Sequence, residues 1–497
     1  MVCRGLWNLH INNKWYRLCH PRGRTSPPDD ESTLCTIISL RDSPDNLEGW
    51  EPVPFPSPIH SNLDYVYTVD RDGGSFIISL WDELDGLLMP LAVRMDLDSI
   101  HQVSDLAISD RPYLDITKYT APNEAQTGPF KTLELDIGIA TAINELQAQL
   151  FTDFVFAWRP YIDDPLTWRC ESLVFKAVSI AILRLAAWDF EVSFDGNADL
   201  PISFASIPRW KYPEADVYWF HGFLVVLEED IAFEDMINKA VLKAQSYLNA
   251  QQVYVIVVSP RRVAFVELSR DTVLVSKSLI LLSNHSATKC SPGFRALSRI
   301  MTSNCWKSHA YKERWQVNLP PEIIQMILHE LDPRDTVAFA QASFAARECY
   351  YASEPQFKDV NVRGCNSSIP CCGKLSGLDK RGVCCSSCYA WSHQECANLE
   401  SSSDQYTCPG CQHEACMDLS PGGINRFSRR KVRKGCPVDV GGSAKVLQLR
   451  LSKPSHLRPE LQFLGNRDGV PPLLVQYTVL FNGAFSGLAY GLEDSPG

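Results

Sequence analysis

The cysteines of this chain are unevenly distributed, and their distribution constrains the fold more than any other feature. Of the 18 cysteines in 497 residues, ten fall between Cys365 and Cys416. The residues up to Trp15 contain no continuous apolar stretch, so we expect no secretory signal. In a chain without such a signal, a short block rich in cysteine and histidine indicates a metal site rather than a set of disulfides. The block at 365–416 is therefore expected to form a small zinc-stabilised finger.

Zinc is the metal that fits the ligand spacing. Pairs of the form Cys-x2-Cys place two thiolates within reach of one ion, and structural zinc takes four sulfur or nitrogen ligands. The candidate ligands, sufficient for two structural zinc ions, are Cys371, Cys372, Cys385, Cys388, His393, Cys396, Cys408 and Cys411. Two assignments stay open. Cys365 could replace one member of the adjacent pair at 371–372, and Cys384 competes with Cys385.

The order of these ligands resembles that of a PHD finger, with four cysteines, one histidine and three cysteines over 371–411. A typical RING finger places its histidine one ligand earlier. Because the ligands of PHD fingers interleave, the resemblance implies two mixed sets. One ion would take the 371–372 pair with His393 and Cys396, and the other would take Cys385, Cys388, Cys408 and Cys411.

Trp391 stands where many PHD fingers carry part of an aromatic cage for methylated lysine. The resemblance therefore implies a chromatin-associated reader of histone tails as one alternative function. Pro370 occupies a place where such readers often carry an aromatic residue, which leaves the cage incomplete. A structural finger, or a finger that contacts a target protein, is the other interpretation.

Residues 316–354 predict three short helices. Two prolines followed by a glutamate are typical of a first helical turn. Apolar residues recur every fourth position at Ile323, Ile327 and Leu331, which gives the first helix an apolar stripe. Helices this short cannot bury such a stripe alone, so they either pack on the rest of the chain or bind a partner.

This helical segment resembles an F-box, although it lacks the tryptophan usual in the third helix. The resemblance implies that its apolar residues dock on the adaptor subunit of a cullin-type (SCF) ubiquitin ligase. The residues at the matching positions are Leu319, Pro320, Ile323, Ile327 and Leu331. The chain would then be a substrate-recognition adaptor and not an enzyme, because the ligase core supplies the chemistry and this chain supplies the protein target.

The expected fold class is multidomain α+β, with a zinc finger and F-box-like helices between larger regions. The expected divisions are a β-rich or irregular region at 1–130 with a proline-rich connector, an α+β domain at 131–310, the F-box-like helices at 316–354, the finger at 365–416, and a basic linker with a short β-rich tail at 417–497. Apolar periodicity predicts helices at 133–156, 165–187 and 233–250, and strands at 75–81, 220–229, 253–259, 262–269, 272–282, 445–453 and 473–481.

For several shorter segments and single residues we expect a structural role and not a catalytic one. Thr36-Ile37-Ile38 is strand-like, Asp163-Asp164 is expected to cap the helix that follows it, and His221 is expected to be a structural histidine. The α+β domain contains none of the common nucleotide-binding, zinc-protease or nucleophile motifs. An enzyme hidden in this domain is a third hypothesis.

The net charge limits the range of partners. A charge of −11 and a sequence pI near 5.5 argue against general binding to nucleic acid or to anionic membranes. A basic run at 426–434 fits either a nuclear-import patch or a solvated loop. We find no apolar run of about 18 residues, so no membrane span is expected. The expected location is nuclear or cytoplasmic.

Overall fold

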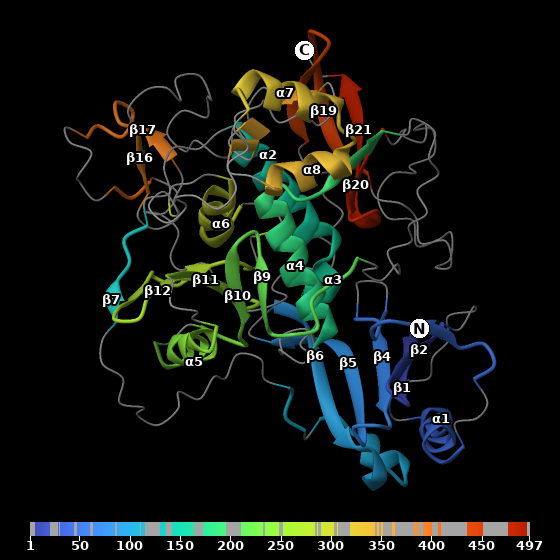
Figure 1. Cartoon of the computed structure of the whole chain (residues 1–497). Helices are drawn as coiled ribbons and strands as arrows, with labels where there is room; N and C mark the ends of the chain where they lie inside the picture. The colour runs from blue at the N-terminus through green and yellow to red at the C-terminus, as the bar shows by residue number, and fades with distance from the viewer. Residues whose placement is uncertain are drawn as a thin grey trace.

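The computed structural model covers the whole chain and describes most of it. The described residues are 5–19, 28, 30–43, 47–59, 63–84, 87–109, 111–114, 130–135, 142–162, 164, 172–194, 210–231, 234–247, 252–283, 286, 290–302, 306, 319–342, 345–346, 349–350, 360–362, 382–385, 391–399, 406–408, 435–450 and 476–494. Over these residues the chain is a mixed α/β protein of multidomain α+β type, with three larger sheets around a central layer of helices (Figure 1).

The N-terminal residues form a six-stranded sheet in the order β3-β2-β1-β4-β5-β6. Its elements are β1 Gly5–Ile11, β2 Lys14–Cys19, β3 Glu51–Val53, β4 Tyr65–Asp70, β5 Ser75–Leu84, β6 Leu87–Asp96, the helix α1 Glu31–Asp42, and the 3-10 turns η1 Leu97–Ser99 and η2 Val103–Leu106. The β1–β4 pair is parallel, and the other pairs are antiparallel. The strand-like reading of residues 36–38 is wrong, because Asp30 caps α1 by accepting from the Ser32 N–H, and Ile37 is buried as part of this helix.

The proline-rich segment at 52–58 is more than the connector that its sequence predicts. Its first residues belong to the edge strand β3. Phe55 is fully buried in the main core, where its ring centroid lies 5.7 Å from that of Tyr212. This contact ties the N-terminal sheet to the central domain.

The central domain is built on a seven-stranded sheet in the order β7-β13-β12-β11-β10-β9, with β14 paired to β12. Its strands are β7 Lys131–Thr132, β9 Val217–Phe220, β10 Phe223–Leu227, β11 Val253–Val258, β12 Arg262–Leu268, β13 Val273–Val275 and β14 Leu279–Ile280. Its helices are α2 Ala142–Ala157, α3 Arg159–Ile162, α4 Leu173–Ala187, α5 Glu234–Gln245 and α6 Pro292–Thr302.

Both faces of this sheet are covered, which explains the unbroken apolar run of β10. Phe223, Val225 and Leu227 pack into the core that α2, α4 and α6 share, whereas Leu224 and Val226 pack into the smaller core under α5. The β10 and β11 strands are parallel, and α5 provides the crossover between them. The three predicted helices are present as α2, α4 and α5, with shifted or shorter bounds. The strands predicted at 220–229 and 272–282 are each interrupted, because the first range spans the turn between β9 and β10 and the second contains the separate strands β13 and β14.

The prediction for the start of α4 needs one correction. The helix begins at Leu173, and Ser172 caps it by accepting from the Phe175 N–H. Asp164 is buried and lies well before this start, so it does not cap α4. Asp163 and residues 165–171 lie outside the described residues.

The strands expected in the tail at 417–497, which the sequence allows to pack either on the finger or on the 131–310 domain, join the central domain. The third sheet has the order β15-β18-β19-β21-β20-β8. Its strands are β8 Glu191–Phe194, β15 Val360–Val362, β18 Cys436–Val440, β19 Ser443–Arg450, β20 Tyr477–Phe481 and β21 Ala484–Asp494. One edge strand, β8, follows α4 directly, and α2 packs against β21. The alternating apolar residues of β20 need a buried face, which the α2–α4 layer provides.

Within the described part of the chain, no helix has both the length and the apolar character needed to cross a membrane.

Candidate functional site

The F-box-like segment contains the first two helices that its sequence predicts. Helix α7 covers Pro321–Glu330 with Pro320 as its N-cap, and α8 covers Pro333–Ala342. The backbone is helical again at 345–346 and 349–350, and the rest of the predicted third helix lies outside the described residues. We call 319–350 the helical hook.

Helix α7 buries one side and exposes the other. Ile324 is only 1% exposed and packs against Ala346 and Cys349. On the opposite side, Ile323 is 41% exposed and Met326 is 64% exposed. The hook therefore closes its own small core and still presents large apolar side chains to solvent, which is unusual for side chains of this size.

The exposed apolar surface of the hook includes the residues that the sequence assigns to a partner. Leu319 is 40% exposed, Pro320 and Ile323 are exposed, and Ile327 and Leu331 are half-buried. Met326 extends this surface, although sequence analysis did not select it. Its position three residues after Ile323 on the same helix was the available signal. Exposed acidic side chains, Glu322 and Glu330, lie on the same helix.

The described part of the finger begins with a two-stranded sheet. Strand β16, Gly382–Cys384, pairs with β17, Trp391–His393, in an antiparallel arrangement that sets Cys384 opposite Trp391. Tyr406 is buried against this sheet, and its hydroxyl donates to Ser392 Oγ at 3.2 Å. The sheet thus positions the segments that carry the candidate ligands.

Two candidate ligands from distant parts of the finger meet in its small core. Cys385 and Cys408 are both buried, and the Cys408 N–H donates to Cys385 Sγ at 3.3 Å. This contact sets the Cys385 sulfur beside the backbone of Cys408. The resemblance to PHD fingers assigns both cysteines to the same ion.

A second pair of candidate ligands lies on one short turn. His393 Nδ1 and Cys396 Sγ are 3.9 Å apart, and the turn between them is closed by the Ala397 N–H donating to the His393 carbonyl at 3.0 Å. Two ligands of one tetrahedral zinc ion lie about 3.6 Å apart, so this spacing fits a shared ion. These two residues are the ones assigned together to the other ion.

The remaining candidate ligands cannot be placed. Cys371, Cys372, Cys388 and Cys411, as well as the alternative Cys365, lie outside the described residues. Only the backbone of Cys384 and of Trp391 is described. Among the described residues, no three potential ligands gather at one point. The donor set that is described, three sulfurs and one imidazole in two pairs, is chemically suited to zinc.

The central domain holds two charged clusters that suit a structural role. His221 Nε2 lies 3.1 Å from Asp189 Oδ2, and both side chains are largely buried. Glu228 is buried at the end of β10, with Lys243 Nζ 2.6 Å and Lys239 Nζ 3.5 Å from its carboxylate. Each acidic group faces a basic partner, as buried charges in a stable core require.

Comparison with known proteins gives no match for this chain, whether with protein-family models, with curated proteins or with solved structures.

Proposed function

We propose that this protein is a substrate-recognition adaptor of a cullin-type (SCF) ubiquitin ligase. The hook would dock on the ligase adaptor, and the other domains would hold a protein target, in the nucleus or the cytoplasm. One observation carries the proposal. Helix α7 exposes Ile323 and Met326, and Leu319 just before the helix is exposed too, while Ile324 closes the hook core.

The proposal explains why these apolar side chains remain exposed. The hook is already packed on the central domain through its α8 side, so folding of the chain alone does not require α7 to present apolar groups. Exposed apolar residues clustered on one helix are typical of a helix that binds a partner. Such a receptor needs no catalytic side chain, because it accelerates transfer by raising the effective concentration of the target near the ligase.

Binding to the purified adaptor–cullin pair tests this proposal directly. The full-length, zinc-loaded chain is immobilised, and the dissociation constant is measured for the parent and for the Leu319→Ala and Ile323→Ala variants. Truncation of an apolar anchor at the centre of an interface should weaken binding about tenfold. Leu242→Ala is the matched control, because Leu242 is also highly exposed but lies on α5, away from the hook. It should bind like the parent.

Two outcomes contradict the proposal. The parent chain, folded and zinc-loaded, could fail to bind the adaptor, or both hook variants could bind as tightly as the parent. The alternative is then a chromatin-associated reader or another interaction module. Binding to a histone-peptide array that disappears in Trp391→Ala would support the reader.

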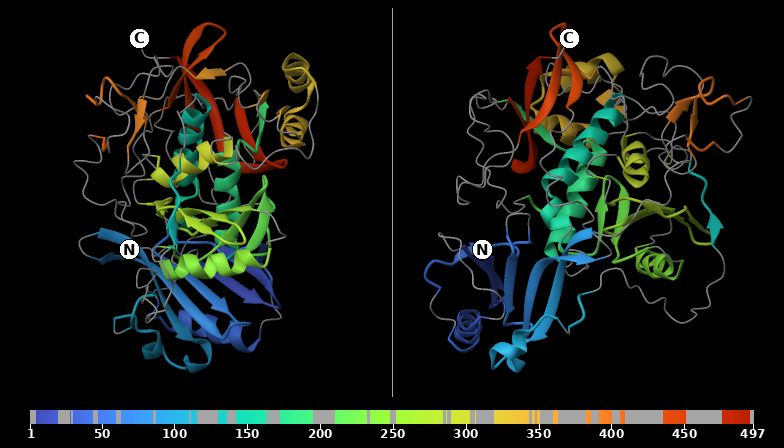
Figure 2. Two further views of the ribbon diagram at one scale, coloured as in Figure 1. Left: turned by 60° about the vertical axis from the view of Figure 1, so that its left-hand side comes forward. Right: turned by 180° about the vertical axis from the view of Figure 1, so that it is seen from behind.

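The finger would contribute a zinc-stabilised surface for the target. Its pairs Cys385 with Cys408 and His393 with Cys396 would each hold one of two structural ions, together with ligands outside the described residues. Zinc supplies folding free energy to such small modules, whose cores are too small to be stable alone. The finger strands and the hook lie on opposite sides of the left view of Figure 2, with strands of the C-terminal sheet between them. A target held by the finger would therefore not block the α7 surface.

A further inference from the structure

The hook is attached to the central domain at the C-terminal end of α4, where the backbone is unusual. Trp188, the C-cap residue, adopts φ 56° and ψ 32°, in the left-handed region. This conformation is unfavourable for a bulky residue, and it persists only where the surroundings enforce it. Here the Trp188 ring is buried and packs on Phe190, with 4.5 Å between ring centroids.

Asp189, the next residue, contacts side chains of α4 and of the β9–β10 turn. Asp189 accepts from Arg184 Nη1 of α4 at 3.2 Å, and lies 3.1 Å from His221 in the β9–β10 turn. The same Arg184 nitrogen donates to Asn482 Oδ1 in the β20–β21 turn at 3.1 Å. Six non-glycine residues in the described chain have positive φ, and three of them, Trp188, His221 and Asn482, belong to this network. We call these residues, with Arg184 and Asp189, the α4 node.

A hydrogen bond joins the hook to this node. The last carbonyl groups of a helix have no partner within the helix and must find one elsewhere. The Trp188 carbonyl finds its partner in the hook, because the Tyr350 hydroxyl donates to it at 3.2 Å. A second attachment follows directly along the chain, where β8, Glu191–Phe194, lies against α8. Tyr350 directly follows Cys349, which packs in the hook core with the buried Ile324.

We infer that Tyr350 is a positioning residue that fixes the direction of the exposed α7 surface relative to the central domain. The α4 node joins α4, the β9–β10 turn and the β20–β21 turn into one rigid base. Tyr350 links the hook to that base, and the contact of α8 with β8 restrains rotation about this link. The consequence for target presentation rests on the proposed function, whereas the positioning itself does not.

The variant Tyr350→Phe isolates the hydrogen bond, since it removes one oxygen and keeps the ring. Spin labels carried on non-natural amino acids at His329 of α7 and Leu242 of α5 report the hook-to-core distance in the full-length, zinc-loaded chain; both side chains are exposed. The parent should give a narrow distance distribution, and Tyr350→Phe a broader one. Amide hydrogen exchange in α7 and α8 should accelerate about fivefold, as expected for the loss of one hydrogen bond. Exchange in β10 and β11 should not change.

Tyr247→Phe is the matched control, because Tyr247 is a partly exposed tyrosine just after α5. Its distance distribution should equal that of the parent. Equal distributions and equal exchange in Tyr350→Phe and the parent overturn the inference.

A separate measurement keeps the two proposals distinguishable. If the parent binds the ligase adaptor, Tyr350→Phe should bind it within about twofold, because no α7 contact is altered, and transfer of ubiquitin to a bound target should slow. An unchanged transfer rate contradicts the consequence for target presentation. If the parent does not bind the adaptor, the ligase proposal fails, and the distance measurement still decides the attachment.

Discussion

At the scale of single residues, Cys385 and its neighbour Cys384 give the sharpest test of the zinc assignment. The Cys408 N–H donates to Cys385 Sγ, which places Cys385 beside another candidate ligand. We therefore expect Cys385→Ser to lower the zinc content of the purified chain from two ions to one. Cys384→Ser is the control and should retain both ions. Metal analysis after gel filtration measures this, and loss of an ion from the Cys384 variant alone would reverse the assignment.

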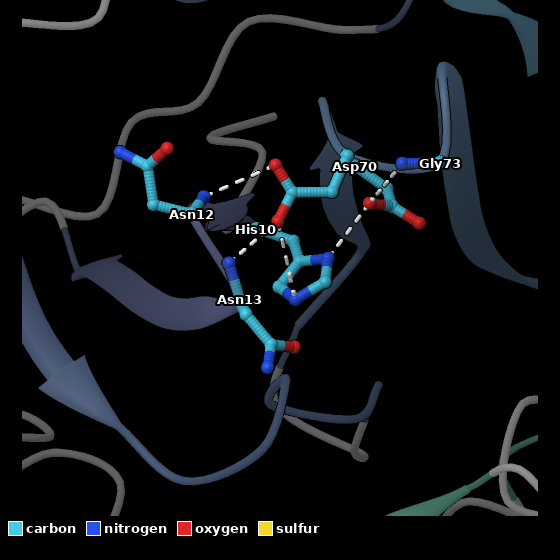
Figure 3. A network of polar contacts seen from close by, with 6 residues as sticks. His10, Asn12, Asn13, Asp70 and Gly73 are labelled. Atoms are coloured by element: carbon cyan, nitrogen blue, oxygen red, sulfur yellow. Dashed lines mark hydrogen bonds and ion pairs between the residues drawn. The ribbon is translucent and has the colours of Figure 1, made fainter.

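Asp72 links the β4–β5 turn to the β1–β2 turn of the N-terminal sheet, whose Asn12 and Asn13 are labelled in Figure 3. Its carboxylate accepts from the backbone N–H groups of Asn13 and Asn12, at 2.6 and 3.0 Å, and lies 3.8 Å from His10 Nε2. The Asn13 hydrogen bond contributes most to lowering the pKa of Asp72 below its usual 3.8, with further contributions from Asn12 and His10. A lowered folded-state pKa adds stability above pH 3.8, and this stability is lost as the pH falls through the folded-state value.

The Asp72→Asn variant should show this dependence. At pH 7 its N-terminal sheet should melt at a lower temperature than that of the parent. Below pH 3.8 the difference should shrink, because the carboxylate of the unfolded parent then takes up a proton more readily than the carboxylate of the folded parent. Circular dichroism in the two pH ranges measures it. Asp271→Asn, at an exposed turn of the central domain, is the control. A difference that grows on acidification would contradict the assignment.

Two structural features at position 487, the backbone conformation and a close neighbour, require glycine. The φ of Gly487 is +89°, and an added Cβ would lie 2.5 Å from Trp158 Nε1. The strained backbone and the clash should together make Gly487→Ala about 2–4 kcal/mol less stable in urea unfolding. Gly483→Ala is a matched control, because φ there is +73° but nothing lies within 4 Å of the added atom. It should lose only about 1 kcal/mol. Equal losses in both variants would rule out the contact with Trp158.

At the scale of elements, local patterns predict some helices well and others poorly. The prolines and apolar spacing of α7 and the amphipathic pattern of α5 indicate both helices. The start of α4 and the existence of α1 were not predicted. In α1, two isoleucines and a threonine favour a strand locally, but the Asp30 cap and burial of Ile37 against the N-terminal sheet outweigh that preference.

Two neighbouring isoleucines of α7 differ in burial, and substitutions at each should therefore differ in their effect on stability. Ile324 is buried in the hook core, so Ile324→Ala should destabilise the hook by about 2–4 kcal/mol. Ile323 is largely exposed, so Ile323→Ala should change stability by less than about 0.5 kcal/mol. Hydrogen exchange within α7 and α8 measures both. A large loss in Ile323→Ala would mean that its side chain serves the hook core and not a partner.

At the scale of the whole molecule, the sequence could not show how the regions join. The strand-like pattern at 473–481 is local, but its partner β8 lies far back in the chain, and the Thr478 hydroxyl reaches the Ser193 carbonyl across 285 positions. No local signal encodes such a pairing, because register and partner follow from burial of a shared face. The resemblance to PHD fingers, in contrast, implies the pairs Cys385 with Cys408 and His393 with Cys396, and the structure brings the two members of each pair close together.

In the sequence, the finger lies between β15 and β18, which are neighbouring strands of the third sheet. Val362 of β15 is paired with Val438 of β18 in an antiparallel ladder. The chain thus leaves the third sheet and returns to the adjacent strand of the same sheet. An antiparallel pair of this kind can be closed by a turn of two residues. The finger is therefore an insertion in a hairpin, and the ladder itself does not depend on it.

A variant with residues 365–435 replaced by Asn-Gly tests this arrangement. The new turn joins Gly364 to Cys436 and suits a hairpin, and the shorter loop costs less closure entropy. The thermal midpoint of the remaining chain should stay within about 3 °C of the parent or rise. Zinc binding should be lost, and a chelator should then have no effect on the melting curve. A large fall in the midpoint would mean that the finger supports the third sheet, so that zinc binding would stabilise the whole chain and not only its inserted module.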